Sequence, residues 1–230
     1  MDGPIRVLIV DDHPVVVSGL RAGLAAQADI EVVDSAGSVA DARQLLEERA
    51  IDVVLLDLRL PDGSGAELLS LSQAPDAPAF VVLSAVESPT FVDAALRLGA
   101  SGFLAKTASV AELVDAVRSV HAGRAAIGAR LLHAARAQPW EPLTGREHEV
   151  VTEIVRGRSN DEIAASLHLA RKTVETYVSR LLERFEVASR TELAVRAERE
   201  GWLELPAAEA RIRAGRGRRH GAARSTRSTA

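Results

Sequence analysis

The chain has 230 residues, 47% hydrophobic and 26% charged, so it is too apolar for a wholly disordered protein and fits one large domain or two small ones. It has no cysteine, which excludes disulfides, thiolate metal sites and cysteine nucleophiles and fits a reducing compartment. Its net charge of −4 is unevenly distributed: residues 1–122 carry −10, residues 123–206 zero and residues 207–230 +6. The negative charge of the first half argues against nucleic-acid binding by that half.

The first apolar run, Val7–Val10, leads directly into two aspartates, which is unlike a secretory signal peptide. No apolar run in the chain approaches the roughly 18 residues that a membrane-spanning helix requires. The sequence therefore predicts a cytoplasmic protein with no membrane partner.

Apolar runs typical of strands buried on both faces alternate with helical stretches in the first half. The expected strands are Ile5–Val10, Ile30–Val33, Val53–Leu56, Ala79–Leu83 and Gly102–Ala105. The expected helices are Pro14–Ala26, Val39–Arg49, Ala66–Leu71, Thr90–Leu98 and Ala111–His121. This alternation predicts an α/β fold, a five-stranded parallel sheet doubly wound by helices on both faces.

Polar residues end several of the predicted strands. Asp11 and Asp12 follow the first, Asp57 the third, Ser84 the fourth and Lys106 the fifth. Ligands bind outside the carboxyl ends of the strands in such sheets, and a group of carboxylates suits a hard divalent ion such as Mg²⁺. An aspartate at a strand end is often only a helix cap, but capping does not explain the lysine.

The segments VDDHPVVVSGL, LLDLRLPDGSG, SAVES and GASGFLAK resemble the receiver domain of bacterial response regulators, over about residues 4–122. The resemblance implies a flavodoxin-like fold and phosphorylation of Asp57 by a partner sensor histidine kinase. It also implies that Asp12, Asp57 and the backbone carbonyl of Arg59 hold Mg²⁺ or Mn²⁺, with Asp11 supporting the ion directly or through water.

The same resemblance implies that Ser84 and Lys106 bind phosphoryl oxygens, and that Ser84 and Phe103 form the switch. The chemistry would be self-phosphorylation and slow autodephosphorylation at Asp57 rather than turnover of a substrate. Phosphoryl transfer depends mainly on positioning and charge, which a carboxylate nucleophile, a divalent ion and a lysine can supply. The chain departs from the family at Asp62, where glycine is frequent.

A short helical stretch, Ile127–Ala137, precedes a proline-containing break at residues 138–142. From Leu143 the pattern predicts four short helices: one ending at Arg156, then Asn160–Leu167, Arg171–Phe185 and one after Ser189. Three of the helix starts have capping-box spacing: Thr144 with Glu147, Ser159 with Glu162, and Ser189 with Glu192. The brief turn between the second and third of these helices predicts a helix-turn-helix.

The segment LTGREHEVVTEIVRGRSNDEIAASLHLARKTVETYVSRLLERF resembles the LuxR-type helix-turn-helix, over about residues 140–203. Together the two resemblances indicate the NarL/FixJ class of response regulators. They imply a homodimer on activation and a third helix that enters the major groove of promoter DNA. The expected DNA-contacting residues are Lys172, Thr173, Glu175, Thr176, Ser179 and Arg180.

Three positions depart from the LuxR-type pattern, one of them Tyr177, where a histidine is frequent. Ala170 replaces the usual Ser or Thr cap of the recognition helix, which gives up roughly 1 kcal/mol of capping. Glu186 stands where a glycine usually closes that helix, so we expect a strained or altered turn there.

These patterns divide the chain into a receiver domain at 4–122, a linker at 123–142, a DNA-binding domain at 143–205 and a basic, disordered tail at 206–230. The tail can add non-specific affinity for phosphates or have no role. The six histidines are scattered, and we expect them to be structural or surface residues.

The leading hypothesis is a two-domain transcription regulator switched by phosphorylation at Asp57. One alternative is a phosphatase with Asp57 as nucleophile, but haloacid-type phosphatases place a second Asp two residues later, where this chain has Arg59. The other is a regulator whose receiver only dimerises. The intact set of Asp12, Asp57, Ser84 and Lys106 argues against that alternative.

Overall fold

A computed structural model describes residues 3–74, 76–137, 141–205 and 207. The chain divides into two compact units, Met1–Trp140 and Glu141–Ala230, and each is described by itself. The basic tail expected at 206–230 lies outside the described residues, apart from Ala207.

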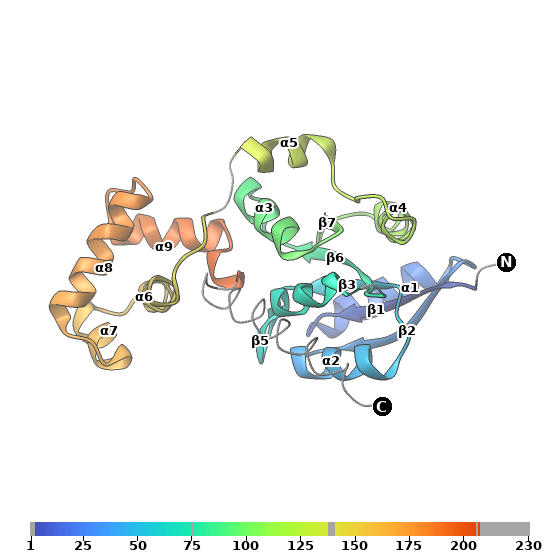
Figure 1. Cartoon of the computed structure of the whole chain (residues 1–230), viewed down its shortest axis with the longest axis horizontal. Helices are drawn as coiled ribbons and strands as arrows, with labels where there is room; N and C mark the ends of the chain where they lie inside the picture. Colours follow the sequence, from blue (N-terminus) through green and yellow to red (C-terminus); the bar gives the residue numbers. More distant parts are fainter. Residues whose placement is uncertain (1–2, 75, 138–140, 206, 208–230) are drawn as a thin grey trace, which may run out of the picture. The chain divides into compact units, whose positions relative to one another are not determined.

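The first unit is built on a five-stranded parallel sheet with the strand order β2-β1-β3-β6-β7 (Figure 1). Its strands are β1 (Ile5–Val10), β2 (Ile30–Ala36), β3 (Val53–Asp57), β6 (Ala79–Ser84) and β7 (Gly102–Ala105). The central strands β1 and β3 are buried almost throughout, as the continuous apolar runs predict. The predicted sheet is therefore confirmed.

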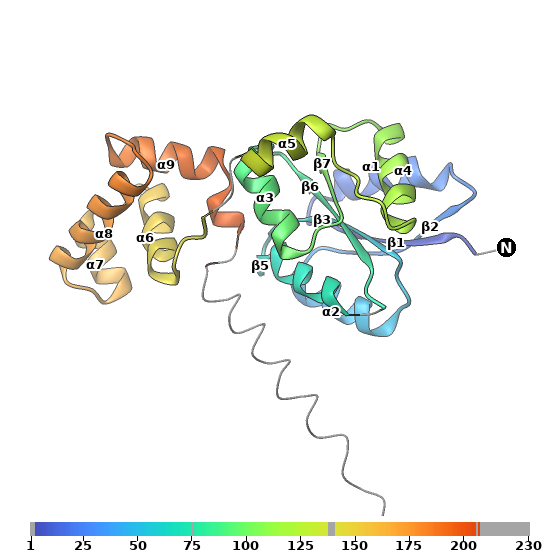
Figure 2. The same cartoon turned by 45° about the horizontal axis from the view of Figure 1, so that its top comes forward.

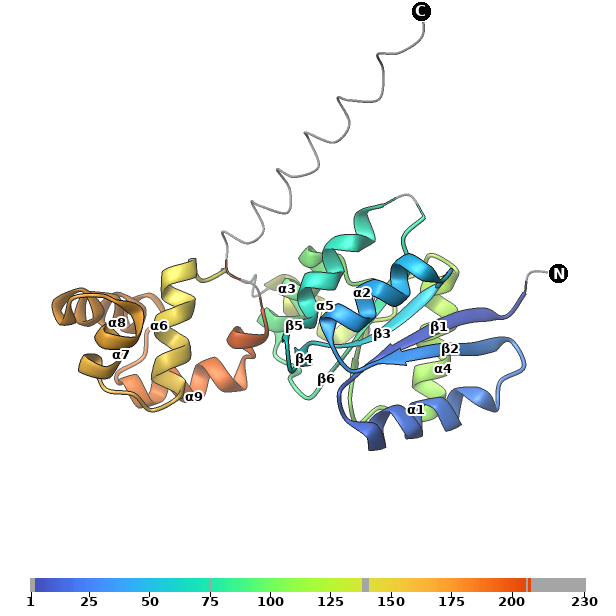
Figure 3. The same ribbon diagram turned by 90° about the horizontal axis from the view of Figure 1, so that it is seen from below.

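Helices cover both faces of this sheet (Figures 2 and 3). The helix α1 packs against α4 on one face, while α2, the 3₁₀ helix η1 and α3 pack on the other. Their bounds are α1 (Pro14–Ala25), α2 (Val39–Glu48), η1 (Gly65–Gln73), α3 (Pro89–Leu98) and α4 (Val110–His121). The sequence predicted each of these elements to within a few residues.

The segment after β3 differs from the expected α-helix at Ala66–Leu71, because it forms the 3₁₀ helix η1. The hydroxyl of Ser70 donates to the carbonyl oxygen of Glu67, a local contact that competes with α-helical pairing. The two-residue strands β4 (Arg59–Leu60) and β5 (Gly63–Ser64) form a short antiparallel hairpin before it, which the sequence pattern did not predict.

Glycine is required where this hairpin returns to the sheet. A Cβ on Gly65 would lie 2.2 Å from the carbonyl oxygen of Asp57, far inside van der Waals contact. The backbone N–H of Gly65 also donates to the carbonyl oxygen of Leu58 at 2.9 Å. The loop that follows Asp57 is thereby closed at its base.

The segment expected as a linker begins against the first unit. Ala126 pairs with Gly102 at the edge of β7, and its carbonyl oxygen accepts from the N–H of Phe103 at 2.9 Å. The helix α5 (Ala129–Ala137) then packs against α3, as both Figure 1 and Figure 2 show. This part of the segment protects the edge strand β7.

The second unit contains four α-helices and a final 3₁₀ turn within the residues described. These elements are α6 (Gly145–Val155), α7 (Asn160–Leu167), α8 (Arg171–Arg184), α9 (Arg190–Arg199) and η2 (Trp202–Glu204). One apolar core joins them, with Val151, Ile163, Val174, Leu181 and Leu193 at its centre. The predicted all-helical domain is confirmed.

The predicted caps are confirmed at two helices of this unit, where Thr144 with Glu147 and Ser159 with Glu162 form reciprocal capping boxes. The third box is wrong in one half. Ser189 Oγ accepts from the N–H of Glu192, but the Glu192 carboxylate accepts from the N–H of Ala188 instead of Ser189. The start of α8 has no side-chain cap at Ala170, as expected.

The turn that closes α8 carries the expected strain, because Glu186 has a φ of 52°. A residue other than glycine adopts this left-handed region at a cost of roughly 1 kcal/mol. In the part of the chain that the structure describes, no helix is both long enough and apolar enough to span a bilayer.

Candidate functional site

The strand register brings four predicted site residues to one edge of the sheet. Val10 pairs with Leu56, so Asp11 and Asp57 follow side by side. Ser84 pairs with Ala105, so Lys106 follows directly after this level on the neighbouring strand β7. This edge is formed by the carboxyl ends of the strands, where the sequence analysis expected a ligand.

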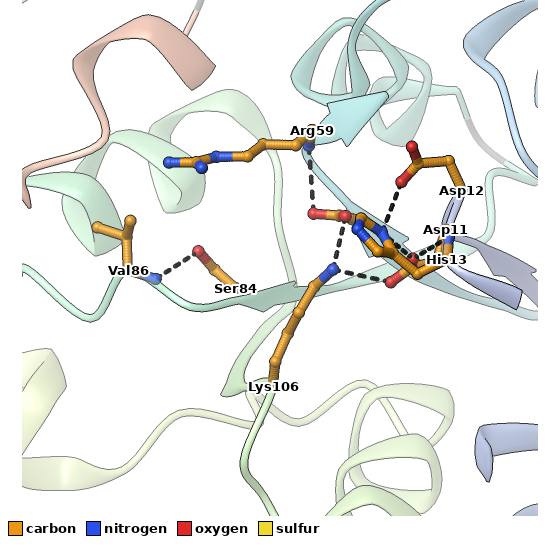
Figure 4. Close-up of polar contacts among 8 residues, drawn as sticks. Asp11, Asp12, His13, Arg59, Ser84, Val86 and Lys106 are labelled. Atoms are coloured by element: carbon orange, nitrogen blue, oxygen red, sulfur yellow. Dashed lines mark hydrogen bonds and ion pairs between the residues drawn. The ribbon is translucent and has the colours of Figure 1, made fainter. Parts of the chain in front are cut away.

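Lys106 lies between two buried carboxylates (Figure 4). Its Nζ donates to Oδ2 of Asp57 at 2.6 Å and to Oδ2 of Asp11 at 2.9 Å. The side chains of Asp11 and Asp57 are only 1% and 5% exposed, so neither is compensated by bulk water. One ammonium group therefore stabilises two carboxylates that would otherwise repel each other.

These contacts keep the lysine protonated. Burial alone would lower the pKa of Lys106, but the hydrogen bonds and charges of Asp57 and Asp11 outweigh burial and raise the pKa above its ordinary value. The ammonium is therefore present throughout the neutral range. It is a fixed positive charge beside Asp57.

The second oxygen of Asp57 is also held. Its Oδ1 accepts a hydrogen bond from the backbone N–H of Arg59 at 3.2 Å. The two oxygens of this carboxylate thus face different partners, one a side-chain ammonium and the other a peptide N–H. This arrangement fixes the orientation of the carboxylate at the start of the β4–β5 hairpin.

Asp12 and His13 form the exposed side of the site. Asp12 is 35% exposed and His13 is 63% exposed, and His13 Nδ1 lies 2.7 Å from Oδ1 of Asp12 and 3.1 Å from Oδ1 of Asp11. His13 is a surface residue, as the sequence analysis allowed for the histidines, but its contact with the two aspartates was not predicted. The signal for it was the position of His13 directly after the two aspartates.

These acidic residues can hold a metal ion. Each of Asp11, Asp12, His13 and Asp57 offers one ligand atom, and these atoms all lie within 4.8 Å of one another. Three carboxylates from two neighbouring strand ends match the oxygen-rich coordination of a hard divalent cation. The peptide of Arg59 borders this cluster through its contact with Asp57.

Ser84 lies at the same edge but does not join the cluster. It is 3% exposed, and its Oγ accepts from the backbone N–H of Val86 at 2.9 Å. Phe103 is also 3% exposed and packs edge to face against Phe91 of α3, with ring centroids 6.0 Å apart. Both residues expected to form the switch are thus enclosed here.

The recognition helix predicted in the second half corresponds to α8. Lys172, Thr176, Ser179 and Arg180 are exposed on it, whereas Thr173 and Glu175 are half-buried. The apolar positions Val174 and Leu181 of the same helix are buried in the core. The exposed residues therefore lie on the side of α8 that faces away from the core.

Two of the expected DNA-contacting side chains already have partners. Glu175 accepts from Nε of Arg171 at 3.0 Å, and Arg171 also contacts Asp161 of α7 at 3.1 Å. The Thr176 hydroxyl donates to the carbonyl oxygen of Lys172 at 2.9 Å. Lys172, Ser179 and Arg180 are the more accessible of the predicted contacts.

The turn between α7 and α8 has the tight geometry of a helix-turn-helix. His168 ends α7 with a φ of 53°, and its N–H donates to the carbonyl oxygen of Ala164. The helix α8 then begins only three residues later, at Arg171. The two helices pack against each other within the core of the second unit.

Family models match both halves of the chain. The model described as response regulator receiver domain matches residues 7–118. The model described as bacterial regulatory proteins, luxR family, matches residues 141–197. Each matched segment lies within one of the two structural units, and residues 119–140 of the first unit lie between the two segments.

Curated relatives match over nearly their whole length. The DNA-binding transcriptional activator DevR/DosR of Mycobacterium tuberculosis is 41% identical over 202 residues, which cover 83% of this chain and 93% of that protein. The transcriptional regulatory protein UhpA of Salmonella typhimurium is 39% identical over 198 residues, which cover 86% of this chain and 100% of that protein.

Among solved structures, the signal receiver domain of the response regulator NarL from Mycobacterium tuberculosis matches with a TM-score of 0.51 and 34% identity. The match covers 54% of this chain and 100% of that domain. It supports the α/β assignment of the first unit.

Replacement of Lys106 by methionine should destabilise the first unit, because it leaves Asp11 and Asp57 buried without a counter-charge. We expect a loss of about 2 kcal/mol at neutral pH, less than the roughly 3–5 kcal/mol of a fully buried pair because the lysine is partly exposed. Thermal unfolding measures this loss. Added Mg²⁺ should restore part of it by supplying positive charge.

The matched control is Arg118→Met, which removes an exposed ion pair with Asp29 in the same unit. Its midpoint of unfolding should stay close to that of the unmodified protein. A Lys106→Met protein that unfolds at the unmodified temperature, with or without Mg²⁺, would contradict the electrostatic account of the site.

Proposed function

The chain belongs to the response regulators that join a receiver domain to a LuxR-type DNA-binding domain, and from this membership we propose a residue-level mechanism for it. It is a DNA-binding transcription regulator of a two-component system, activated by phosphorylation, and not a conventional enzyme. The observation that carries the mechanism is the Asp57 carboxylate held between Lys106 and the Arg59 peptide.

In this mechanism Asp57 is the phosphoacceptor. One of its carboxylate oxygens attacks the phosphorus of a phosphohistidine on a sensor kinase, the P–N bond breaks, and an acyl phosphate forms on Asp57. Lys106 stays beside the reacting group and stabilises the negative charge on the transferred phosphoryl oxygens. In the slow autodephosphorylation expected of a receiver, a water molecule attacks the phosphorus of the acyl phosphate, the P–O bond to Asp57 breaks, and inorganic phosphate leaves with the Asp57 carboxylate restored.

The residues that would hold Mg²⁺ or Mn²⁺ are Asp12, Asp57 and the backbone carbonyl of Arg59, with Asp11 bound directly or through water. A bound divalent cation supplies charge neutralisation and a template for the phosphoryl oxygens. Asp12 is the most exposed of these carboxylates, and a cation bound at its Oδ1 would compete with the contact that His13 makes there.

Ser84 and Phe103 are the proposed switch. The Ser84 hydroxyl would leave the Val86 N–H and turn toward a phosphoryl oxygen on Asp57. Phe103 is already buried against Phe91, so phosphorylation would stabilise this inward position, and with it the surface of α3, and would not have to create it. We propose that this change favours a homodimer.

The helix α8 is the proposed reading element, placed in the major groove of promoter DNA. Lys172 and Arg180 suit phosphates or guanine, and Thr173, Thr176 and Ser179 can donate or accept at either. Glu175 can accept from cytosine only after its ion pair with Arg171 opens or is shared. A dimer would present two such helices to paired half-sites.

We place the functional boundaries at 4–122 for the receiver, 123–142 for the linker, 143–205 for the DNA-binding domain and 206–230 for the basic tail. The partners are a sensor histidine kinase, double-stranded promoter DNA and a second copy of the chain, with no membrane partner. The proposed location is the cytoplasm, where its DNA and kinase partners are accessible.

Replacement of Asp57 by asparagine tests the phosphoacceptor. The amide cannot form an acyl phosphate, so incubation with radiolabelled acetyl phosphate and Mg²⁺ should leave the protein unlabelled, while the unmodified chain takes up acid-labile label. Asp12→Asn is the matched control for loss of one acidic charge. It should slow labelling, but the label should still be attached to Asp57. Label that persists in Asp57→Asn would disprove the assignment.

Replacement of Lys172 by alanine tests the DNA-contacting face of α8. If Lys172 meets a phosphate, its loss should weaken binding to all duplexes and reduce the slope of log affinity against log salt by about one. The full chain is titrated with duplex DNA at several salt concentrations. The control is Arg146→Ala. Arg146 is an exposed cation of α6 that is paired with Glu149, and its replacement should leave the slope unchanged.

A further inference from the structure

Asp62 connects the loop that follows the phosphoacceptor to the helix on its far side. The carboxylate lies at the tip of the β4–β5 hairpin and accepts two backbone hydrogen bonds from the first turn of α2. Its Oδ1 accepts from the N–H of Val39 at 2.8 Å, and its Oδ2 accepts from the N–H of Ala40 at 3.0 Å. These two bonds join segments more than twenty residues apart in sequence.

The start of α2 needs these two acceptors. Ser38, the cap of α2, satisfies the N–H of Asp41 through its hydroxyl and the N–H of Ala42 through its carbonyl oxygen. The N–H groups of Val39 and Ala40 lie in the same turn and cannot pair within the helix. A two-oxygen carboxylate at the positive end of a helix is well suited to both.

The hydrogen bonds also keep the bridging group charged. The N–H donors of Val39 and Ala40 lower the pKa of Asp62 below its ordinary value, so the carboxylate is ionised at neutral pH. Both contacts are therefore charge-assisted.

The loop that Asp62 caps also borders the acidic cluster. The N–H of Asp11 donates to the carbonyl oxygen of Ala36 at 3.0 Å. A Cβ on Gly37 would lie 3.9 Å from the Cα of Asp12, so the chain between β2 and α2 passes directly beside this residue. The loops after β1, β2 and β3 thus follow one another around the site.

Asp62 joins the β4–β5 hairpin to the start of α2. The base of the hairpin is fixed by the bond from Gly65 to Leu58, and its tip lies against α2 because a Cβ on Gly63 would be 3.8 Å from Val39 Cγ2. A second link, between Arg43 of α2 and Glu67 of η1, is exposed and 3.8 Å long. Such an exposed pair contributes little stability.

We propose that Asp62 is a positioning residue for phosphoryl transfer: by joining the phosphoacceptor loop to the start of α2, it holds the Arg59 peptide and the Asp12 carboxylate at the spacing that a divalent cation requires. This inference rests on the proposed function of the site. Asp62 itself touches neither Asp57 nor the phosphoryl group. It acts through the two loops that its carboxylate joins, as outer-shell groups of metal sites do.

The test compares Asp62→Ala with Asp41→Ala in the full chain. Each variant removes one carboxylate. The Asp62 carboxylate reaches the first turn of α2 from the hairpin, whereas the Asp41 carboxylate belongs to that turn and accepts from the hydroxyl of Ser38, the cap of the same helix. The dissociation constant of Mg²⁺ is measured by calorimetry without a phosphodonor. We expect Asp62→Ala to raise it roughly tenfold, the lower end of the cost of losing an outer-shell partner, and Asp41→Ala to leave it near that of the unmodified chain.

Asp62→Asn separates position from charge. The amide has lost the charge but keeps one acceptor oxygen for one of the two N–H groups, so positioning predicts a dissociation constant between those of the unmodified chain and Asp62→Ala. The Mg²⁺ concentration for half-maximal labelling by acetyl phosphate should follow the same order. The maximal labelling rate at saturating Mg²⁺ should change less than this midpoint, because Asp57 and Lys106 are intact.

Three results would overturn the inference. Equal Mg²⁺ affinity in Asp62→Ala and the unmodified chain would show that the loop holds its position without the link. Equal losses of Mg²⁺ affinity in Asp62→Ala and Asp41→Ala would show that Asp62 acts only as a helix cap. Equal losses of Mg²⁺ affinity in Asp62→Ala and Asp62→Asn would show that only its negative charge matters. An unmodified chain that takes no label from acetyl phosphate would instead overturn the proposed function on which the inference rests.

Discussion

The contact of one lysine ammonium with two buried carboxylates is the interaction on which the first unit and its chemistry depend. Asp11 and Asp57 lie at adjacent strand ends, where the parallel register forces them together, and Lys106 reaches both from β7. Two nearly unexposed negative charges so close to each other need a cation. The charge that stabilises these carboxylates in the folded protein is also the one that, in the proposed mechanism, would stabilise a transferred phosphoryl group.

This constraint explains why a site of buried charges lies beside an apolar core and not within it. The strands β3 and β6 are apolar until their last residues, Asp57 and Ser84, and β1 is apolar from Val7 to Val10, directly before Asp11. Phe103 and Phe91 then connect that edge to α3, against which α5 packs. In the proposed mechanism, this packing is what would carry a change at Asp57 to the surface of the first unit.

Much of this arrangement could be predicted from the sequence because it follows from local rules. Continuous apolar runs predict buried parallel strands, the order of the runs fixes which ends share an edge, and Ser or Thr followed by Glu predicts helix starts such as Thr144 and Ser159. The strained turn at Glu186 was also predictable, since the family has a glycine where this chain has a charged residue.

The remaining features depend on contacts between distant segments, which periodicity does not encode. The β4–β5 hairpin depends on the close approach of Gly65 to Asp57. The pairing of His13 with Asp12, the exchange of partners at Glu192 and the link from Asp62 to α2 depend on side-chain directions. In the same way Glu175 has the right spacing for DNA contact, yet Arg171 holds it.

The most direct test of the account is the affinity of the full chain for DNA with Asp57 free and phosphorylated. A duplex selected from a random pool by the acetyl phosphate-treated protein would be titrated with treated and untreated protein at one salt concentration. The account predicts tighter binding after treatment by roughly 5- to 150-fold, the usual range of coupling between two sites. Equal affinity in the two states would contradict the claim that the acidic site controls the DNA-binding unit.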